Sequence, residues 1–432
     1  MLTHILFAIL PETVILLLAF VCRTVSPLQL FPFLLLMAGL KTGYAVYHGF
    51  DSSCTGRRFL IIPAASFLLE LGGLTRVYAD LTSEIRLTTD ALLIIAFVGV
   101  TVLLIKMLRY EKIQKLIRYR PFLVWMGIMG ISILGLLVYA LFAQETNGTK
   151  NWLYIGGISI QFSELLKLGV TAAFAFTVIR LRRSPYPIIT FYIYMMITGF
   201  GLAVLIRELG TTMQFMFFTL SGGILIASDY QKGQTPILAS KAFPLGCAWF
   251  MCIGLGCIKA FLRKYCISHD LDEYSTLGGI NCRLNSITEE TLLARQHIAD
   301  APVVRMNLSE YTPIISYSDP ETIAADYCYA TMCSCYGWLI PLAAAAFFIF
   351  ALGFVFFHLK KHIQTSTSAA AGIAAAGILL FQVVIHVLGV FRLCPFTGIT
   401  LPFASPGYSS LAVSVILTCV MIYAMTDNRK EV

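Results

Sequence analysis

A single long polar interruption, at about residues 263–335, divides a chain that is otherwise a series of apolar runs. This stretch holds ten of the chain's 23 acidic residues and five of its 31 lysines and arginines, so it carries −5 while the remainder carries +13. Membrane proteins retain positive charge on the cytoplasmic side. The charge split therefore predicts one non-cytoplasmic loop set against a basic cytoplasmic face.

The composition fits a bilayer rather than water. Hydrophobic residues make up 58% of the chain and charged residues 12%, whereas soluble domains average about 25% charged residues. Apolar runs long enough to cross hydrocarbon must be helical in lipid, because an open sheet would leave backbone groups unpaired. We expect an all-α polytopic membrane protein with about 12 transmembrane helices. The runs lie near 4–22, 28–48, 59–77, 90–108, 121–143, 160–180, 188–206, 211–228, 241–262, 336–357, 369–391 and 409–426.

The basic clusters give this arrangement an orientation. They lie at 57–58, 106–120, 180–183, 360–361 and 429–430. With twelve spans and a cytoplasmic N-terminus, every cluster falls in the cytoplasm, as does the C-terminus, and the acidic loop falls outside. The net charge of +8 therefore indicates contact with membrane lipid headgroups and not with nucleic acid.

Asp326 stands near the end of the acidic loop, directly before the apolar stretch Tyr327-Cys328-Tyr329-Ala330. Charge at the mouth of a membrane bundle is expensive, so a carboxylate there is a functional hypothesis. The alternative is a solvated acid beside a helix start, where the helix dipole favours negative charge.

Three short stretches, taken together, resemble a known family. The first joins Asn151-Trp152-Leu153 to residues 160–168, the second is Arg207-Glu208-Leu209-Gly210-Thr211, and the third is residues 394–410, CPFTGITLPFASPGYSS. In this order and at these intervals they resemble the SEDS family, the FtsW, RodA and SpoVE proteins of bacterial division, elongation and sporulation. Gln382 and His386 fall where that family has a further pair of polar residues.

The resemblance implies a domain organisation. It covers about residues 59–426 and implies a core of ten helices. On this reading 1–58 is an N-terminal extension of two helices and 59–262 is the first part of the core. The large extracellular loop is 263–335, and 336–432 contains the last three helices and a short cytoplasmic tail.

The resemblance also implies an activity. SEDS proteins are peptidoglycan glycosyltransferases of the bacterial cytoplasmic membrane that polymerise lipid II, release undecaprenyl pyrophosphate and work with a class B penicillin-binding protein. Asp326 falls on the family's proposed catalytic carboxylate. The assignment makes chemical sense, because a carboxylate near the attacking sugar hydroxyl can take its proton as a general base.

The same motifs supply candidate substrate-binding residues. Lys167 and Arg207 are candidates to stabilise charge developing on the pyrophosphate. The remaining candidates by motif position are Glu164, Glu208, Trp152, Ser409 and Ser410.

Other interpretations of these residues stay open. Lys167 could snorkel near a helix end, or it could form a structural ion pair with Glu164 at helical spacing. Glu208 could be an interfacial acid at a helix end, and Ser409 and Ser410 could cap the last span.

Departures from the family pattern leave two alternative functions open. Asn151 stands in place of an Arg, Phe162 in place of a Pro, Glu208 in place of an Asp, and Ser334-Cys335 in place of two Glu. The alternatives are a flippase for lipid-linked precursors and a catalytically silent scaffold for a penicillin-binding protein. No cofactor or metal site is indicated, and a divalent cation is left open.

Overall fold

The protein is an all-α polytopic membrane protein, as the sequence predicts. The computed structural model describes residues 60–78, 84–108, 110–111, 115, 119–146, 149–155, 158–180, 186–230, 260–271, 281, 289–305, 325–363, 366–391 and 393–426. The predicted extension at 1–58, with the spans expected at 4–22 and 28–48, lies outside these residues. So does most of the span expected at 241–262.

The long helices follow the apolar runs. In the first part of the chain they are α4 (Ile61–Tyr78), α5 (Glu84–Leu108), α7 (Pro121–Phe142), α8 (Phe162–Arg180), α9 (Tyr186–Phe200) and α10 (Leu209–Tyr230). After the large loop come α16 (Leu339–Lys360), α17 (Thr367–Val390) and α18 (Tyr408–Thr426). Within the described residues, five stretches are both long and apolar enough to cross a membrane: Phe122–Phe142, Ile189–Ile206, Leu339–Lys360, Thr367–Val390 and Tyr408–Thr426.

The span expected at 336–357 begins later, at Leu339. The apolar residues before it belong to a separate short helix, α15 (Cys328–Tyr336), which ends at Gly337 with a φ of 79°. A positive φ is incompatible with a continuing helix and is cheap only for glycine. Hydropathy could not detect this break because both sides of it are apolar.

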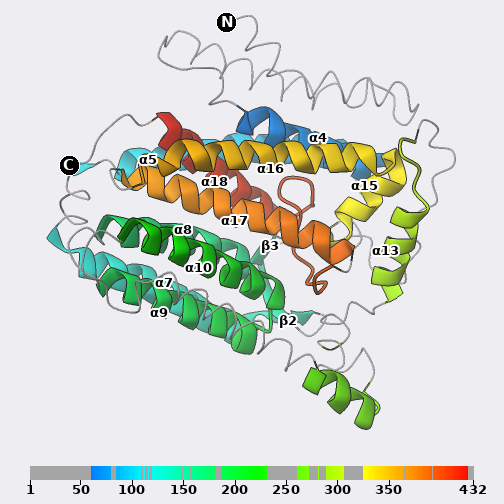
Figure 1. The fold of residues 1–432 in the computed structure, drawn as a ribbon, viewed down its shortest axis with the longest axis horizontal. Coiled ribbons are helices and arrows are strands. Elements are labelled where there is room, and N and C mark those ends of the chain that lie inside the picture. The colour runs from blue at the N-terminus through cyan, green and yellow to red at the C-terminus, as the bar shows by residue number, and fades with distance from the viewer. Residues whose placement is uncertain are drawn as a thin grey trace, which may run out of the picture.

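The large loop contains two described helices that pack on the bundle. Helix α15 contacts α4, α16 and α17, and α13 (Glu289–Ala299) contacts α15 and α17. Figure 1 shows α13 running across the ends of α16 and α17, whereas the long helices lie side by side. All nine residues of α15 are buried, so the loop contributes directly to the protein core.

A small sheet connects α7 to α8, and the sequence analysis did not predict it. Strands β1 (Gln144–Thr146), β2 (Thr149–Ile155) and β3 (Ile158–Gln161) pair antiparallel in the order β1-β2-β3. The register places Trp152 opposite both Gln144 and Gln161. Strands this short carry too little alternation to be recognised beside long apolar helices.

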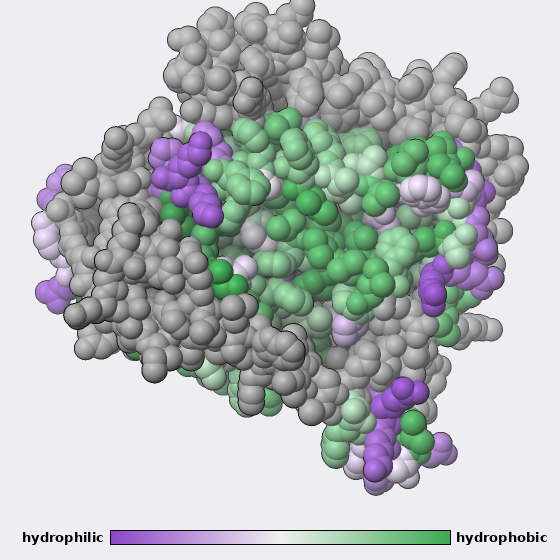
Figure 2. Space-filling model, in the orientation of Figure 1, coloured by the Kyte–Doolittle hydropathy of each residue, from purple (hydrophilic) through white to green (hydrophobic). Residues whose placement is uncertain are grey.

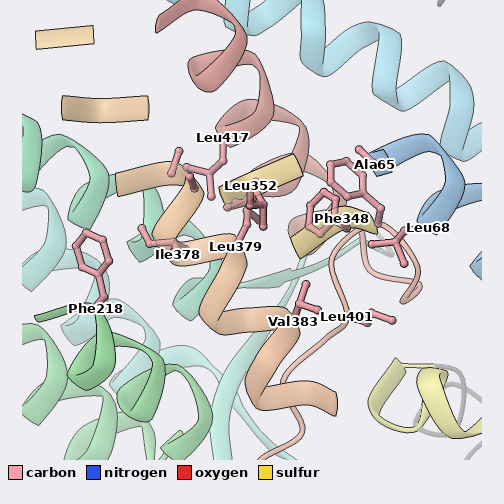
Figure 3. Packing of buried hydrophobic residues seen from close by; sticks show 14 of the residues in the cluster. Ala65, Leu68, Phe218, Phe348, Leu352, Ile378, Leu379, Val383, Leu401 and Leu417 are labelled. Atoms are coloured by element: carbon pink, nitrogen blue, oxygen red, sulfur yellow. The ribbon is translucent and has the colours of Figure 1, made fainter. Parts of the chain in front are cut away.

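Helix α17 lies at the centre of the bundle, against α8, α10, α16 and α18. Its first half is rich in alanine and glycine, and small side chains let neighbouring backbones approach closely. At Gly372 a Cβ atom would lie 2.5 Å from Leu359 Cδ1 and 2.8 Å from Ala424 Cβ. Figure 3 shows the core that results, with Leu352, Ile378, Leu379 and Leu417 close together.

The outer surface of the bundle is apolar. Figure 2 shows a broad hydrophobic face over α16 and α17, with polar residues toward its two ends. A water-soluble protein would not expose such a continuous patch. Such a face suits the interior of a membrane, where water does not reach it.

We predict that Gly72→Ala destabilises the protein because α4 touches the 394–407 segment at this residue. A Cβ at Gly72 would lie 2.5 Å from Ala404 Cα, so backbone must move, at a cost of about 1–3 kcal/mol. In the control, Gly130→Ala on α7, the new methyl meets nothing within 4 Å and gains up to about 1 kcal/mol of helix propensity. Thermal unfolding in detergent should give a lower Tm for Gly72→Ala than for wild type. Equal Tm values for the two variants would contradict the contact.

Candidate functional site

The candidate residues gather at one end of the bundle, which we call the site end. Helices α8, α10, α16 and α18 begin there, and α4, α7 and α17 end there, because consecutive spans run in opposite directions (Figure 1). Glu164 lies in the first turn of α8 and Glu208 directly precedes α10. Ser409 and Ser410 lie in the first turn of α18, and Asp326 lies just before Tyr327, the N-cap residue of α15. Residues spread over some 250 positions therefore occupy one region.

A buried ion pair forms the centre of this region. Lys167 Nζ donates to Glu164 Oε1 at 2.6 Å and to Gln382 Oε1 at 2.9 Å. The Lys167 and Glu164 side chains are only 1% and 3% exposed, which excludes the snorkelling interpretation for Lys167. A buried charge requires a close partner, and this pair satisfies that requirement on the α8–α17 interface.

Gln382 and Thr400 extend the pair into a network. Gln382 Nε2 donates to Thr400 O and Oγ1 at 3.0 and 3.1 Å. Thr400 Oγ1 lies 3.4 Å from Glu164 Oε1 and 2.8 Å from Ser410 Oγ. The network therefore joins α8, α17, α18 and the segment before α18, and Ser410 holds that segment in place.

Ser409 connects the same helix start to the sheet. Its Oγ accepts from Gln161 N–H at 3.0 Å and donates to Ser159 O at 3.3 Å. Both partners belong to β3, so Ser409 fixes the strand against α18. Neither serine is seen to cap its own helix through these bonds, and both instead contact other elements.

Glu208 caps the N-terminus of α10. Its Oε1 accepts from Thr211 N–H at 3.0 Å, and a carboxylate at a helix N-terminus is favoured by the exposed amides and the dipole. The preceding segment is a π-helical turn, η2 (Gly201–Ile206), and Arg207 follows it in the left-handed conformation with a φ of 61°. The Glu208 carboxylate also interacts electrostatically with Lys167 and Glu164, so it belongs to the same polar region.

The 394–407 segment supports Asp326 and its two neighbours in the chain. Tyr327 stacks on Phe396 with ring centroids 4.6 Å apart. Ser405 Oγ donates to Ala325 O at 2.8 Å and accepts from Leu401 N–H at 2.8 Å. A Cβ on Gly398, whose φ is 64°, would lie only 3.0 Å from Asp326 Oδ2. The half-buried Asp326 carboxylate therefore rests against the Gly398 backbone, and a larger residue would displace it.

The two halves of the site meet across this segment. At Gly210, beside Glu208, a Cβ would lie 2.7 Å from Ile399 Cγ1 and 3.0 Å from Thr397 O. His386 Nδ1 lies 2.6 Å from Ile399 O. Because a carbonyl only accepts, this His386 nitrogen carries the proton. Asp326 and the buried network thus contact neighbouring residues of one short segment.

Several buried acceptor atoms at the site have no hydrogen-bond partner among the described residues. They are Glu164 Oε2, Glu208 Oε2, Gln214 Oε1 and His386 Nε2. Buried polar atoms are normally satisfied by protein or ordered water. All four need a donor, so this part of the bundle suits water or a ligand rich in O–H and N–H groups. In the described part of the chain, no group of three or more His, Cys, Asp and Glu side chains could hold a metal ion.

Trp152 and Arg207 are the remaining motif candidates. Trp152 lies on β2, half-buried, opposite Gln161. Arg207 is half-buried in the turn before α10. Their assignment to substrate binding stays a prediction. Arg76, at the end of α4, is buried and forms an ion pair with Asp90 at 3.4 Å.

The departures in the first motif are accommodated structurally. Phe162 stacks on Tyr139 with centroids 4.9 Å apart, and a Cβ at Gly135 would overlap its ring. Asn151 makes two bonds with Ser163, donating to Oγ at 2.9 Å and accepting from N–H at 3.3 Å. Phe162 and Asn151 therefore support the start of α8, the helix that carries Glu164 and Lys167.

Sequence reasoning did not name Gln382, Thr400, Ser405 and Gly398 as site residues. Gln382 could have been suspected as an uncharged polar residue inside an apolar span, where polar groups are costly. Thr400, Ser405 and Gly398 lie within the third motif, but only the structure shows that they contact Glu164, Ala325 and Asp326, respectively.

We predict that Lys167→Met lowers stability strongly, because it leaves the Glu164 carboxylate buried without its cation, at a cost of about 3–5 kcal/mol. The double variant Glu164→Gln with Lys167→Met removes both charges and should recover most of that loss. Unfolding of the purified variants in a graded denaturing detergent gives the comparison. A double variant no more stable than Lys167→Met, or a single variant as stable as wild type, would contradict the structural ion pair.

Comparison with known proteins finds similar sequences and structures. A family model described as a cell cycle protein, FtsW/RodA/SpoVE, matches residues 60–262 and 320–430. A probable peptidoglycan glycosyltransferase FtsW from Bacillus subtilis strain 168 is 24% identical over 346 residues, which cover 76% of this chain and 78% of that protein.

Two solved structures have a similar fold. One belongs to a study of the structural coordination of polymerization and crosslinking by a peptidoglycan synthase complex, with a TM-score of 0.57 and 18% identity over 88% of this chain and 100% of that chain. The other is the rod shape determining protein RodA of Thermus thermophilus, with a TM-score of 0.51 and 18% identity over the same shares. Because the family model matches well over half of the residues, the chain belongs to the FtsW/RodA/SpoVE, or SEDS, family.

Proposed function

We propose that this protein is a peptidoglycan glycosyltransferase that polymerises lipid II at the outer face of the bacterial cytoplasmic membrane, with Asp326 as the general base. Membership of the FtsW/RodA/SpoVE family supports the proposal, as does similarity to a protein named as a probable peptidoglycan glycosyltransferase. The single observation that carries it is the close contact between the Asp326 carboxylate and Gly398, a residue of the third sequence motif.

The environment of Asp326 suits a base. The carboxylate is half-buried and lies against Gly398. Its two neighbours in the chain are also held, Tyr327 by stacking on Phe396 and Ala325 by a hydrogen bond from Ser405. A base must be fixed within hydrogen-bond reach of the hydroxyl from which it takes a proton. In lipid II polymerisation, the sugar hydroxyl attacks the anomeric carbon of the donor and becomes the glycosidic oxygen, and its proton passes to Asp326. The bond from that carbon to the polyprenyl pyrophosphate breaks, and the pyrophosphate leaves.

The polar region behind Asp326 suits the remainder of the substrate. Its partnerless acceptors on Glu164, Glu208 and His386 match the hydroxyl and amide donors of an N-acetylated sugar. Lys167 is the candidate cation for the pyrophosphate, but its ammonium group already donates hydrogen bonds to Glu164 and Gln382. We infer that donor binding would require Lys167 to exchange a protein partner for phosphate, which couples substrate entry to the α8–α17 interface.

A penicillin-binding protein is the proposed partner. The similar solved structure comes from a complex that coordinates polymerization with crosslinking. A chain that only polymerises glycan strands would need a transpeptidase to join them, and a class B enzyme fits this role. The scaffold and flippase alternatives stay distinguishable from this proposal through the following experiment.

We predict that Asp326→Asn inserts and folds normally but loses glycan-strand synthesis. The amide is nearly isosteric but cannot take a proton, so the rate should fall by roughly 10²- to 10⁴-fold. The assay is strand formation from lipid II by purified protein, with and without a class B penicillin-binding protein. Asp300→Asn, at an exposed acid of the same loop, is the control and should keep the wild-type rate.

Two outcomes would overturn the assignment. A rate for Asp326→Asn above about a tenth of wild type would exclude Asp326 as the base. A wild-type protein that makes no strands with any partner would favour the scaffold, and lipid II translocation without polymerisation would favour the flippase.

We predict that Gly398→Ala also lowers strand synthesis. The new methyl would lie 3.0 Å from Asp326 Oδ2 and the residue would keep a strained positive φ, which costs roughly 1–2 kcal/mol. Gly389→Ala, also at the site end but with no neighbour nearer than 3.6 Å, is the matched control. Activity should fall at least about ten-fold for Gly398→Ala, corresponding to about 1.4 kcal/mol in the barrier. Equal activity of the two variants would show that Gly398 does not position the carboxylate.

A further inference from the structure

A second buried ion pair joins α4 to α5 at the site end. Arg76, in the last turn of α4, donates from Nη1 and Nη2 to a single oxygen of Asp90, Oδ2, at 3.4 Å each. Its Nε donates to Gly72 O at 3.3 Å. The two charged side chains are 2% and 8% exposed. A buried pair of this kind is weak evidence for stability, because apolar residues of similar volume often stabilise a fold equally well. Its role must therefore be sought in what surrounds it.

One chain of contacts links Arg76 to the turn before α15. Helix α4 lies along α16 and also contacts α15 (Figure 1). Gly72, whose carbonyl binds Arg76, packs so closely on the 394–407 segment that a Cβ there would lie 2.5 Å from Ala404 Cα. The next residue of that segment, Ser405, donates to Ala325 O at 2.8 Å. Arg76 is thus connected to the backbone directly before the candidate base.

A second contact reaches the other side of the candidate base. Cys328, in the first turn of α15, is 1% exposed. Its thiol interacts electrostatically with Arg76 and forms a hydrogen bond with Ser405. Because Cys328 follows Asp326 by two residues, Ser405 binds on both sides of the candidate base, and Arg76 lies behind both contacts.

Helix stability does not explain a cation at this place. Cys328 is the first residue of α15, so the Arg76 guanidinium lies near the N-terminus of that helix. The exposed amides there already carry partial positive charge, and a cation beside them is unfavourable. Asp90 offsets part of this cost. A guanidinium retained in such a position suits a residue that orders the start of α15.

We propose that Arg76 is a positioning residue for Asp326, because its guanidinium, paired with Asp90, fixes the start of α15 against the segment before α18. Arg76 acts through Ser405 and Cys328 and not on the substrate. The catalytic consequence rests on the proposed function, whereas the contact with α15 can be measured without lipid II.

A double variant separates this role from that of a merely structural pair. Arg76→Met with Asp90→Leu removes both charges and leaves apolar side chains, so its Tm in detergent should stay near that of wild type or rise. Its kcat for strand synthesis from lipid II should nevertheless fall by about ten- to a hundred-fold, because a catalytic group displaced by ~1 Å can lose that much. KM for lipid II should stay unchanged, since the base is not assigned to ground-state binding.

Two single variants complete the set. Arg76→Lys should keep most of the wild-type kcat, because one ammonium can replace the two Nη atoms that share a single Asp90 oxygen. Thr75→Val is the matched control, since this neighbour on α4 is also buried but its hydroxyl donates to Leu71 O within its own helix at 2.7 Å. Its kcat should equal that of wild type.

Hydrogen exchange tests the contact without lipid II. The Thr331 amide closes the first turn of α15 by donating to Tyr327 O at 3.0 Å. In the double variant the amides of this turn should exchange at least about ten-fold faster, because the turn opens more often. In Thr75→Val they should exchange at the wild-type rate. These rates report on the start of α15 whether or not the chain polymerises lipid II.

Several results would overturn the proposal. Wild-type exchange and kcat in a stable double variant would show that the pair only joins α4 to α5. Faster exchange with normal kcat, or lower kcat with normal exchange, would separate the start of α15 from catalysis and contradict the positioning role.

A further variant covers the case in which the double variant does not fold. Cys328→Ala removes the thiol that Arg76 faces while both charges remain, and unchanged exchange and kcat in this variant would also refute the proposal. A wild-type chain that makes no strands would refute the proposed function instead. Exchange alone would then decide whether Arg76 holds the start of α15.

Discussion

The buried Glu164–Lys167 ion pair is the constraint on which the arrangement of the site end depends. A charged pair inside a membrane bundle is stable only when its remaining hydrogen-bonding capacity is met. Gln382 from α17 and Thr400 from the 394–407 segment meet part of it, and Ser410 from α18 binds Thr400 in turn. The cost of burying two charges thus explains why helices that are distant in sequence carry polar residues that meet in one network.

The 394–407 segment transmits this order to Asp326. On one side it is bound by the buried network and by His386, and on the other it supports the Asp326 carboxylate and the start of α15. One of its residues, Phe403, has a positive φ of 65°, and such strain in a non-glycine residue persists only where surrounding contacts fix it. Here α4 provides one such contact at Gly72. The segment is therefore a rigid floor for the candidate base and not a mobile loop end.

The large loop holds the other side of the element that carries Asp326. Its helix α15 is buried within the bundle. Backbone hydrogen bonds between residues 302–305 and 336–339 fix the far end of α15 beside α16. The short element that carries Asp326 is thus fixed at both ends, by contacts with Gly398 and Ser405 before α15 and by the close packing at Gly337 after it. Such preorganisation is what proton transfer to a fixed base requires.

The sequence by itself determined the membrane class and the positions of the described spans to within a few residues, because the hydropathy of a span is a local property of the chain. It did not determine the break at Gly337, the β1–β3 sheet, or the roles of Gln382 and Gly398. Those depend on backbone conformation and on which atoms meet across helices. Only the tertiary structure decided that Lys167 is paired and buried rather than exposed, because burial results from the packing of α8 against α17.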